Sequence, residues 1–156
     1  MERFTIGTVS EGTLRPEDLI PVFEDVLGEA NGLTPHGIRT AFFNESDSDL
    51  EYLDTLFDEL NNQAPPFAYF GAHPDDGADY GFWIDHECLD EAIHSQRSQN
   101  ITWICFENPD RLLSKYNADA LYLQDHGVWV EVNDHGNVTL FTNDNGEPAE
   151  VIWSIV

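Results

Sequence analysis

Four carboxylates at helical spacing are the side chains of this chain best arranged to act together. They are Asp47, Glu51, Asp54 and Asp58, which follow one another at intervals of 4, 3 and 4 residues. On a continuous helix they would share one face, with about 5 to 6 Å between neighbours along the axis. Such a column attracts basic groups, and its members repel one another when no base lies between them.

The column belongs to a longer acidic run. Between residues 40 and 96 the chain has no lysine or arginine, yet it carries 14 Asp and Glu. The whole chain has 30 Asp and Glu against 6 Lys and Arg, a formal net charge of −24. Such a field repels nucleic acid and anionic lipid. We therefore expect no direct nucleic-acid partner and no membrane partner, and we expect a basic protein as the partner.

One interpretation of this charge is DNA mimicry, in which carboxylates on a rigid frame imitate the phosphates of a duplex. The protein would then be a non-enzymatic inhibitor that occupies the basic nucleic-acid-binding groove of a host defence protein, such as a restriction enzyme or a CRISPR effector. Tyr52 and Tyr80 would supply apolar anchors. The contact surface that we expect comprises Asp47, Glu51, Asp54, Asp58, Asp75, Asp76 and Asp79.

Other interpretations of the charge stay open. The acids of a solvated face, or of a protein adapted to high salt, need no partner. An immunity or antitoxin-like protein that covers a basic toxin would need the same complementarity. A homodimer, which would lengthen the acidic surface, also stays open.

Histidines add a second kind of chemistry. His86, Asp90 and His94 recur at four-residue intervals, so on a helix they share one face and could bind a divalent metal together with a fourth ligand. The alternative is a polar helix face, and we assign no metal or other cofactor. His126 and His135 follow aspartates and precede glycines, which predicts turn positions for both.

The segment His73-Pro-Asp-Asp resembles the metal-binding tetrad of the zinc-dependent N-acetylglucosaminyl deacetylases. The resemblance implies a metal-dependent hydrolase in which His73 and one aspartate of the pair Asp75 and Asp76 bind zinc, while the other aspartate acts as a base. It covers four or five residues. The chain has Gly77 where that family has an acidic residue.

Two further stretches, residues 70–83 and 132–141, are similar to segments of small acidic proteins carried by phages and plasmids. Mobile elements of this kind commonly encode acidic inhibitors of restriction enzymes and CRISPR effectors, several of which imitate DNA. The resemblance therefore implies an anti-defence context and transfers no residue-level role.

The elements that must position these residues follow from periodicity and turn signals. In the first half we expect a strand over 3–9 and a helix from 16 to 28 or 32, in which Pro21 implies a late start or a kink. A helix over 47–62 should bury Leu50, Leu53, Phe57 and Leu60. A hairpin over 67–84 with a long acidic connection follows.

In the second half we expect a helix over 85–95, a strand over 101–106 and a turn of helix over 108–116. Strands near 120–124, 128–133, 137–142 and 150–155 should form an antiparallel meander, because Asp-x-Gly triplets separate them. The predicted fold class is thus α+β, a single acidic domain over 1–156 whose C-terminal antiparallel β-meander packs against two or three helices.

Composition supports a folded chain, since 41% of residues are hydrophobic and 12% are aromatic. Cys88 and Cys105 lie in apolar contexts, and we expect both to be reduced core residues. The N-terminus lacks the basic and apolar regions of a secretory signal, and no segment approaches about 20 apolar residues. These features predict a cytoplasmic protein of the host cell.

Overall fold

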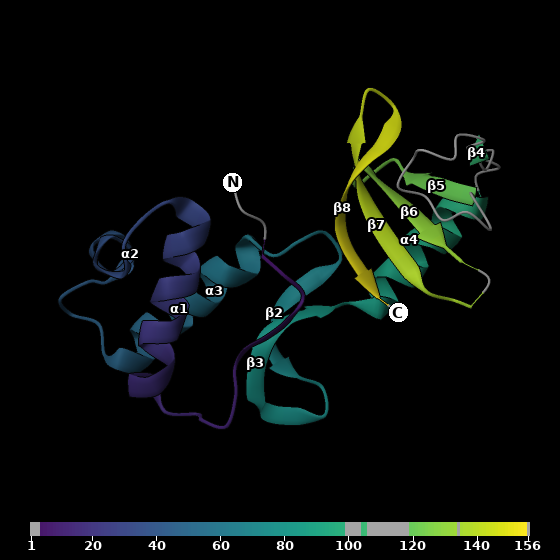
Figure 1. Cartoon of the computed structure of the whole chain (residues 1–156). Coiled ribbons are helices and arrows are strands. Elements are labelled where there is room, and N and C mark those ends of the chain that lie inside the picture. Colours follow the sequence, from purple (N-terminus) through teal and green to yellow (C-terminus); the bar gives the residue numbers. More distant parts are fainter. Residues whose placement is uncertain (1–3, 99–103, 106–118, 134, 156) are drawn as a thin grey trace. The chain divides into compact units, whose positions relative to one another are not determined.

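The computed structural model describes residues 4–98, 104–105, 119–133 and 135–155. The chain divides into two compact units, Met1–Asp85 and His86–Val156, and each is described by itself (Figure 1). Both contain antiparallel strands and at least one helix, which confirms the α+β class. The expectation that residues 1–156 form one domain stays a prediction.

The first unit has three helices on one face of a three-stranded sheet. Its elements are β1 (Gly7–Ser10), α1 (Pro16–Asn31), α2 (Pro35–Phe42), α3 (Asp49–Asn62), β2 (Ala68–His73) and β3 (Asp76–Ile84). The strand order is β1-β3-β2 and both pairings are antiparallel. The core joins apolar residues of all three helices to Phe70 of β2 and Phe82 of β3.

The first strand begins later than predicted, and the first helix begins at the expected residue. β1 starts at Gly7, opposite Phe82, so the predicted strand over 3–9 was wrong over residues 4–6. α1 starts at Pro16, which excludes the late start that Pro21 had suggested. Gly32 caps its C-terminal end. This glycine has the left-handed conformation, with φ 66°, and its backbone N–H donates to Glu29 O.

Helix α2 was not predicted. Its signals are local, because Thr34 Oγ1 accepts the Gly37 N–H at 3.1 Å and Pro35 occupies the first helical turn. The buried Ile38 and the partly buried Phe42 attach this short helix to the core.

Helix α3 confirms the prediction over 47–62, with Ser48 as its N-cap. Its buried residues are Tyr52, Leu53, Leu56 and Leu60, whereas Leu50 is 64% exposed. The predicted stripe was therefore wrong at Leu50. The buried face is rotated because the Tyr52 ring is taken into the core, where its hydroxyl has a charged partner on α1.

The hairpin over 67–84 is confirmed, but its long acidic connection was wrong. His73 already pairs with Asp76, so the turn between β2 and β3 consists of Pro74 and Asp75. Asp76 and Asp79 consequently belong to β3 and not to a loop.

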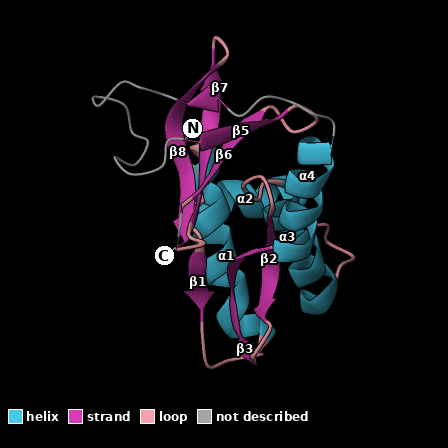
Figure 2. Ribbon diagram, turned by 90° about the vertical axis from the view of Figure 1, so that its right-hand side faces the viewer, coloured by secondary structure: helices cyan, strands magenta, loops and turns pink. Residues whose placement is uncertain are grey.

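The second unit contains the predicted meander. Its elements are α4 (His86–Ser98), β4 (Ile104–Cys105), β5 (Asp119–Leu123), β6 (Val128–Val132), β7 (Val138–Asp144) and β8 (Glu147–Ile155). The sheet order β4-β5-β6-β7-β8 is antiparallel throughout (Figure 1). Figure 2 shows strands β5 to β8 of this sheet. Helix α4 packs against β5. At the last reversal Asn145 and Gly146 both have positive φ, which a two-residue hairpin turn requires.

The expectations for Cys88 and for the segment 101–116 have different outcomes. Cys88 is exposed on α4, so its assignment to the core was wrong, since it lies beside the buried Leu89 on the solvent side of the helix. The strand predicted over 101–106 is described only at Ile104–Cys105, and the helical turn predicted over 108–116 lies outside the described residues. Within the described residues no helix combines the length and apolarity that crossing a bilayer would need.

Candidate acidic interface

The solvent side of α3 carries two carboxylates that have no structural task. Asp54 and Asp58 are both exposed and lie four residues apart, about 6 Å along the helix axis. The opposite side of the helix is anchored in the core by Tyr52 and Leu56. Within the described residues neither carboxylate contacts a basic side chain, so the charge of both faces water.

The other two members of the predicted column make hydrogen bonds at or just before the start of α3. Asp47 precedes the helix, and its Oδ2 accepts the Asn44 N–H at 3.0 Å. Glu51 Oε2 accepts the Ser48 backbone N–H at 2.8 Å, while Ser48 Oγ accepts the Glu51 N–H. These bonds to Ser48, first its backbone and then its hydroxyl, lower the pKa of Glu51. Of the four, Glu51 thus caps α3, Asp47 bonds the segment before the helix, and Asp54 and Asp58 make no side-chain hydrogen bond within the described residues.

The hairpin acids do not form one group with α3. Asp75 lies in the exposed β2–β3 turn, and Asp76 Oδ1 accepts the Ala78 N–H at 3.0 Å. Asp79 precedes Tyr80, whose ring packs on Phe57 of α3, so the alternation of a strand places Asp79 on the other face of the sheet. There Asp79 Oδ2 accepts the Thr8 hydroxyl at 3.2 Å. Asp79 therefore does not share the surface of Asp54 and Asp58.

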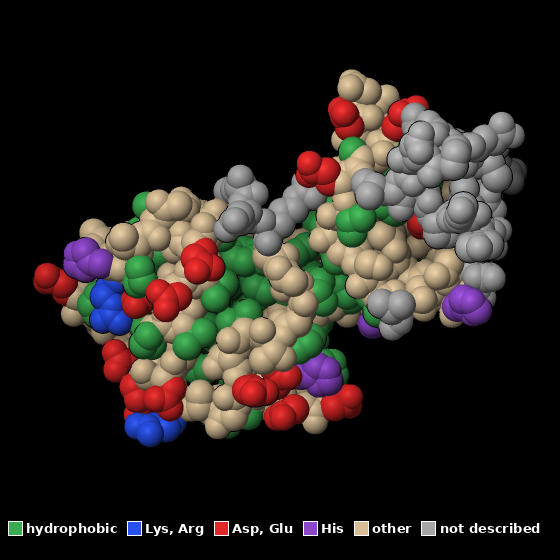
Figure 3. Space-filling view, in the orientation of Figure 1, with side chains coloured by type: hydrophobic (Ala, Val, Ile, Leu, Met, Phe, Trp, Pro, Cys, Tyr) green, Lys and Arg blue, Asp and Glu red, His purple; other side chains and the backbone are tan. Residues whose placement is uncertain are grey.

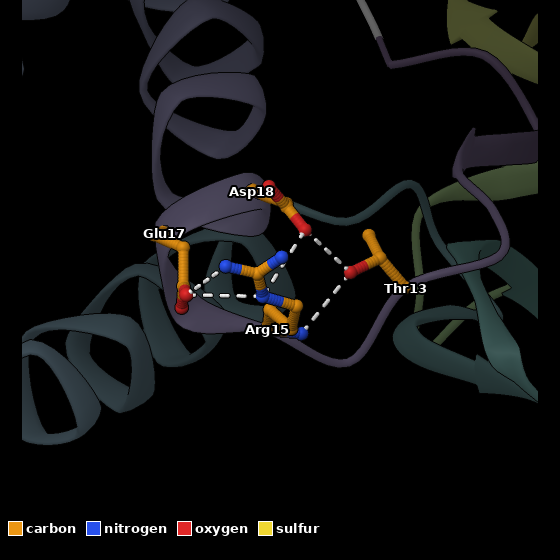
Figure 4. Close-up of polar contacts among 4 residues, drawn as sticks. All are labelled: Thr13, Arg15, Glu17 and Asp18. Carbon is orange, nitrogen blue, oxygen red and sulfur yellow. Dashed lines mark hydrogen bonds and ion pairs between the residues drawn. The ribbon is translucent and has the colours of Figure 1, made fainter.

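The two arginines described in this unit form ion pairs with acids other than Asp54 and Asp58. Arg15 pairs with Glu17 and Asp18 at the start of α1, and Thr13 Oγ1 donates to Asp18 Oδ2 at 2.8 Å (Figure 4). The pKa of Glu17 is lowered, by its own backbone N–H first and by Arg15 second. In Figure 3 the basic side chains of this unit lie against acidic ones. Neither arginine is thus available to neutralise α3.

Arg39 belongs to a network that fixes the three helices. Its Nε donates to Glu24 Oε1 at 2.7 Å, and its guanidinium lies 5.4 Å from the Tyr52 ring centroid. Glu24 is 6% exposed, and its carboxylate raises the pKa of Arg39 through this hydrogen bond. The network joins α1, α2 and α3, so it holds the helix that carries Asp54 and Asp58 in place.

Helix α1 carries further exposed acids that sequence reasoning did not select. Asp25 and Glu29 are both exposed and lie one turn apart, on a helix that packs against α3. Their four-residue spacing was the available signal. Within the described residues neither carboxylate has a cationic partner.

The histidine segments do not converge on a metal. The described residues contain no group of three His, Cys, Asp or Glu side chains that could hold one ion. His73 Nδ1 accepts the Asp75 N–H at 3.1 Å, and its ring packs edge-on against Trp83. His86, Asp90 and His94 are all exposed along α4, where the continuous helix spreads them over two turns.

No protein-family model, no curated protein and no solved structure matches this chain.

Proposed function

We propose that this protein is an acidic inhibitor that occupies the basic nucleic-acid-binding groove of another protein, and that Asp54 and Asp58 on α3 act as phosphate surrogates. The observation that carries the proposal is that, among the described residues, no basic side chain pairs with Asp54 or Asp58. The first unit has 18 Asp and Glu against 3 Arg, and its two described arginines pair with Glu17, Asp18 and Glu24. An external cation is the natural complement of the remaining charge.

A surrogate for phosphates must also be rigid, because ordering a mobile acidic segment would cost binding free energy. Helix α3 meets this requirement. Its first turn is closed by the Ser48–Glu51 capping box, and Tyr52, Leu56 and Leu60 are fully buried. Asp54 and Asp58 consequently project from a fixed frame at a fixed spacing.

The apolar anchor of the interface differs from the one expected. Tyr52 is fully buried, and Tyr80 is partly buried with its ring packed against the core, so neither ring projects freely into solvent. Leu50 is 64% exposed and lies one turn before Asp54, on the same side of α3. A large apolar side chain beside two carboxylates gives the surface a contact that duplex DNA lacks, and such contacts favour one partner over other basic proteins.

The experiment is affinity capture from a lysate of the source organism at low salt. The immobilised chain is washed with a salt gradient or with a short DNA duplex, and the released proteins are identified by mass spectrometry. The matched variants are Asp54→Asn/Asp58→Asn and, on the second unit, Asp90→Asn/Glu150→Gln, which remove the same number of exposed charges.

Mimicry predicts one nucleic-acid-binding protein that duplex DNA releases and that the α3 variant fails to retain, while the second-unit variant still retains it. A captured protein that resists duplex DNA would overturn the mimicry and indicate an immunity-type complex. Retention by both variants alike would show that the α3 carboxylates are only a solvated face.

A further inference from the structure

A groove of about 440 Å³ lies in the first unit, between α1 and the segment that leads into β1. Its lining comes from this segment and β1, from α1 and from β3: Phe4, Thr5, Thr8, Val9, Val26, Glu29, Ala30 and the buried Phe82. Figure 3 shows apolar side chains reaching the surface between α1 and this segment. The volume is within the range of about 300–1,000 Å³ that small-molecule sites occupy.

One carboxylate lines this groove, beside the hydroxyl-bearing Thr5 and Thr8. Glu29 belongs to its α1 wall, and within the described residues its side chain has no hydrogen bond or ion pair. Asp25 lies one turn earlier on the solvent side of the same helix and adds a like charge. The groove therefore has a mixed polar and apolar lining and is negative at one side.

The aromatic part of the groove is the Phe4 ring. It stacks on the buried Phe82 ring, with centroids 4.5 Å apart and an interplanar angle of 17°, so Phe4 has the only ring face of the pair that a ligand could contact. A planar cation packs on an aromatic surface of this kind, and an arginine side chain also has an apolar stem that suits Val26 and Ala30. A lysine ammonium carries a point charge with a tighter hydration shell and gains less from such a wall.

We propose that the groove binds an arginine side chain of the basic partner, with the stem along Phe4 and Val26 and the guanidinium paired with Glu29. The inference rests on the proposed function, since it supplies the site through which the acidic unit would select its partner. Charge complementarity identifies the occupant, because a groove beside Glu29 and Asp25 disfavours an anionic or neutral side chain.

The test is a titration of the ¹⁵N-labelled full chain with N-acetyl-L-arginine methylamide, followed by amide chemical shifts. The citrulline analogue, which has the same shape without the charge, and the lysine analogue are titrated in parallel. We expect saturable shifts at Thr5, Thr8 and Ala30 for arginine, with affinity weaker by about tenfold for citrulline, the loss of one charge-assisted bond. Equal affinity for arginine and either analogue would overturn the inference.

Variants locate the binding. Glu29→Gln should weaken arginine binding by about tenfold, whereas Asp25→Asn, which removes a charge one turn away, should change it by less than about threefold. Ala30→Leu fills the groove without changing its charge and should abolish the shifts. Equal losses in Glu29→Gln and Asp25→Asn, or binding that survives Ala30→Leu, would show attraction by the general field and no groove site.

This outcome is separable from that of the proposed function. The α3 variants leave Glu29 intact, and the Glu29→Gln variant leaves Asp54 and Asp58 intact. If the chain shows no saturable arginine binding but still captures a partner that duplex DNA releases, the arginine site alone is overturned. Arginine binding without duplex-sensitive capture would keep the site and overturn the mimicry.

Discussion

Tyr52 on α3 donates its hydroxyl hydrogen to Glu24 on α1 at 2.8 Å, inside the core of the first unit. Glu24 Oε1 accepts this bond and the one from Arg39 Nε, so a single buried oxygen joins three helices. The network orients α3 and, with it, the exposed carboxylates of the proposed interface. A buried carboxylate of this kind is destabilising unless each bond to it is made.

Tyr52→Phe should lower the free energy of unfolding by about 1.5–3 kcal/mol, the range for a hydrogen bond to a charged group. Urea unfolding followed through the amide resonances of the first unit measures this. Tyr69→Phe is the matched control, because Tyr69 lies on the other face of the sheet, and it should change stability by less than about 0.5 kcal/mol. Equal effects of the two substitutions would argue against the Glu24 bond.

Stability should fall at alkaline pH through the same residue. Burial first, and the bond to Glu24 second, raise the pKa of Tyr52 above its ordinary value. A raised folded-state pKa gives a contribution that is complete below the unfolded pKa of about 10 and is lost as the pH rises past it. The stability difference between the native chain and Tyr52→Phe should thus be constant from about pH 7 to 9 and shrink above about pH 10. A difference that grows at alkaline pH would contradict this sign.

Ser48→Ala should destabilise the first unit by about 1 kcal/mol, since it removes the acceptor for the Glu51 N–H. Ser46→Ala, two residues earlier in the exposed segment before α3, is the control and should lie within about 0.5 kcal/mol of the native chain. Thermal unfolding by circular dichroism compares the two. An unchanged Ser48→Ala variant would mean that the capping box does not hold α3.

Gly81→Ala should destabilise the sheet, because a Cβ there would lie 2.2 Å from the Gly7 carbonyl oxygen of β1. Separating β1 from β3 should cost about 1–3 kcal/mol, as overpacking does elsewhere. Gly77→Ala, on the same strand with nothing within 4 Å of its Cβ, should be tolerated. Hydrogen exchange of the β1 amides measures whether β1 separates from β3. Equal protection of these amides in the two variants would contradict the close approach of Gly81 to Gly7.

The sequence predicted those elements whose signals are local. The Asn145–Gly146 reversal and the Ser48–Glu51 capping box are read within a few residues, and the meander and α3 were found where expected. Helix α2 also has local signals, Thr34 and Pro35, but its buried stripe is short and was missed. Periodicity alone needs more turns than eight residues provide.

The predicted site residues depended on information that the sequence does not carry. Asp47, Glu51, Asp54 and Asp58 recur at helical spacing, but their roles differ. Asp47 lies outside α3, which begins only at Asp49, and Glu51 is bonded in the capping box. Asp79 lies on a different surface from the predicted one, because the hairpin turn is only two residues long and Asp79 therefore belongs to β3. Leu50 is exposed because Tyr52, which has a partner on α1, occupies the core instead. Each of these depends on contacts between distant segments.

The central claim, that Asp54 and Asp58 stand in for phosphates, is tested most directly by binding competition on the captured partner. A fluorescent duplex bound to that partner is titrated with the native chain, with Asp54→Asn/Asp58→Asn and with the second-unit control. Mimicry predicts mutually exclusive binding, displacement that weakens steeply with salt, and a loss of about tenfold or more for the α3 variant alone. A ternary complex of partner, duplex and chain, or equal displacement by the α3 variant and the native chain, would contradict it.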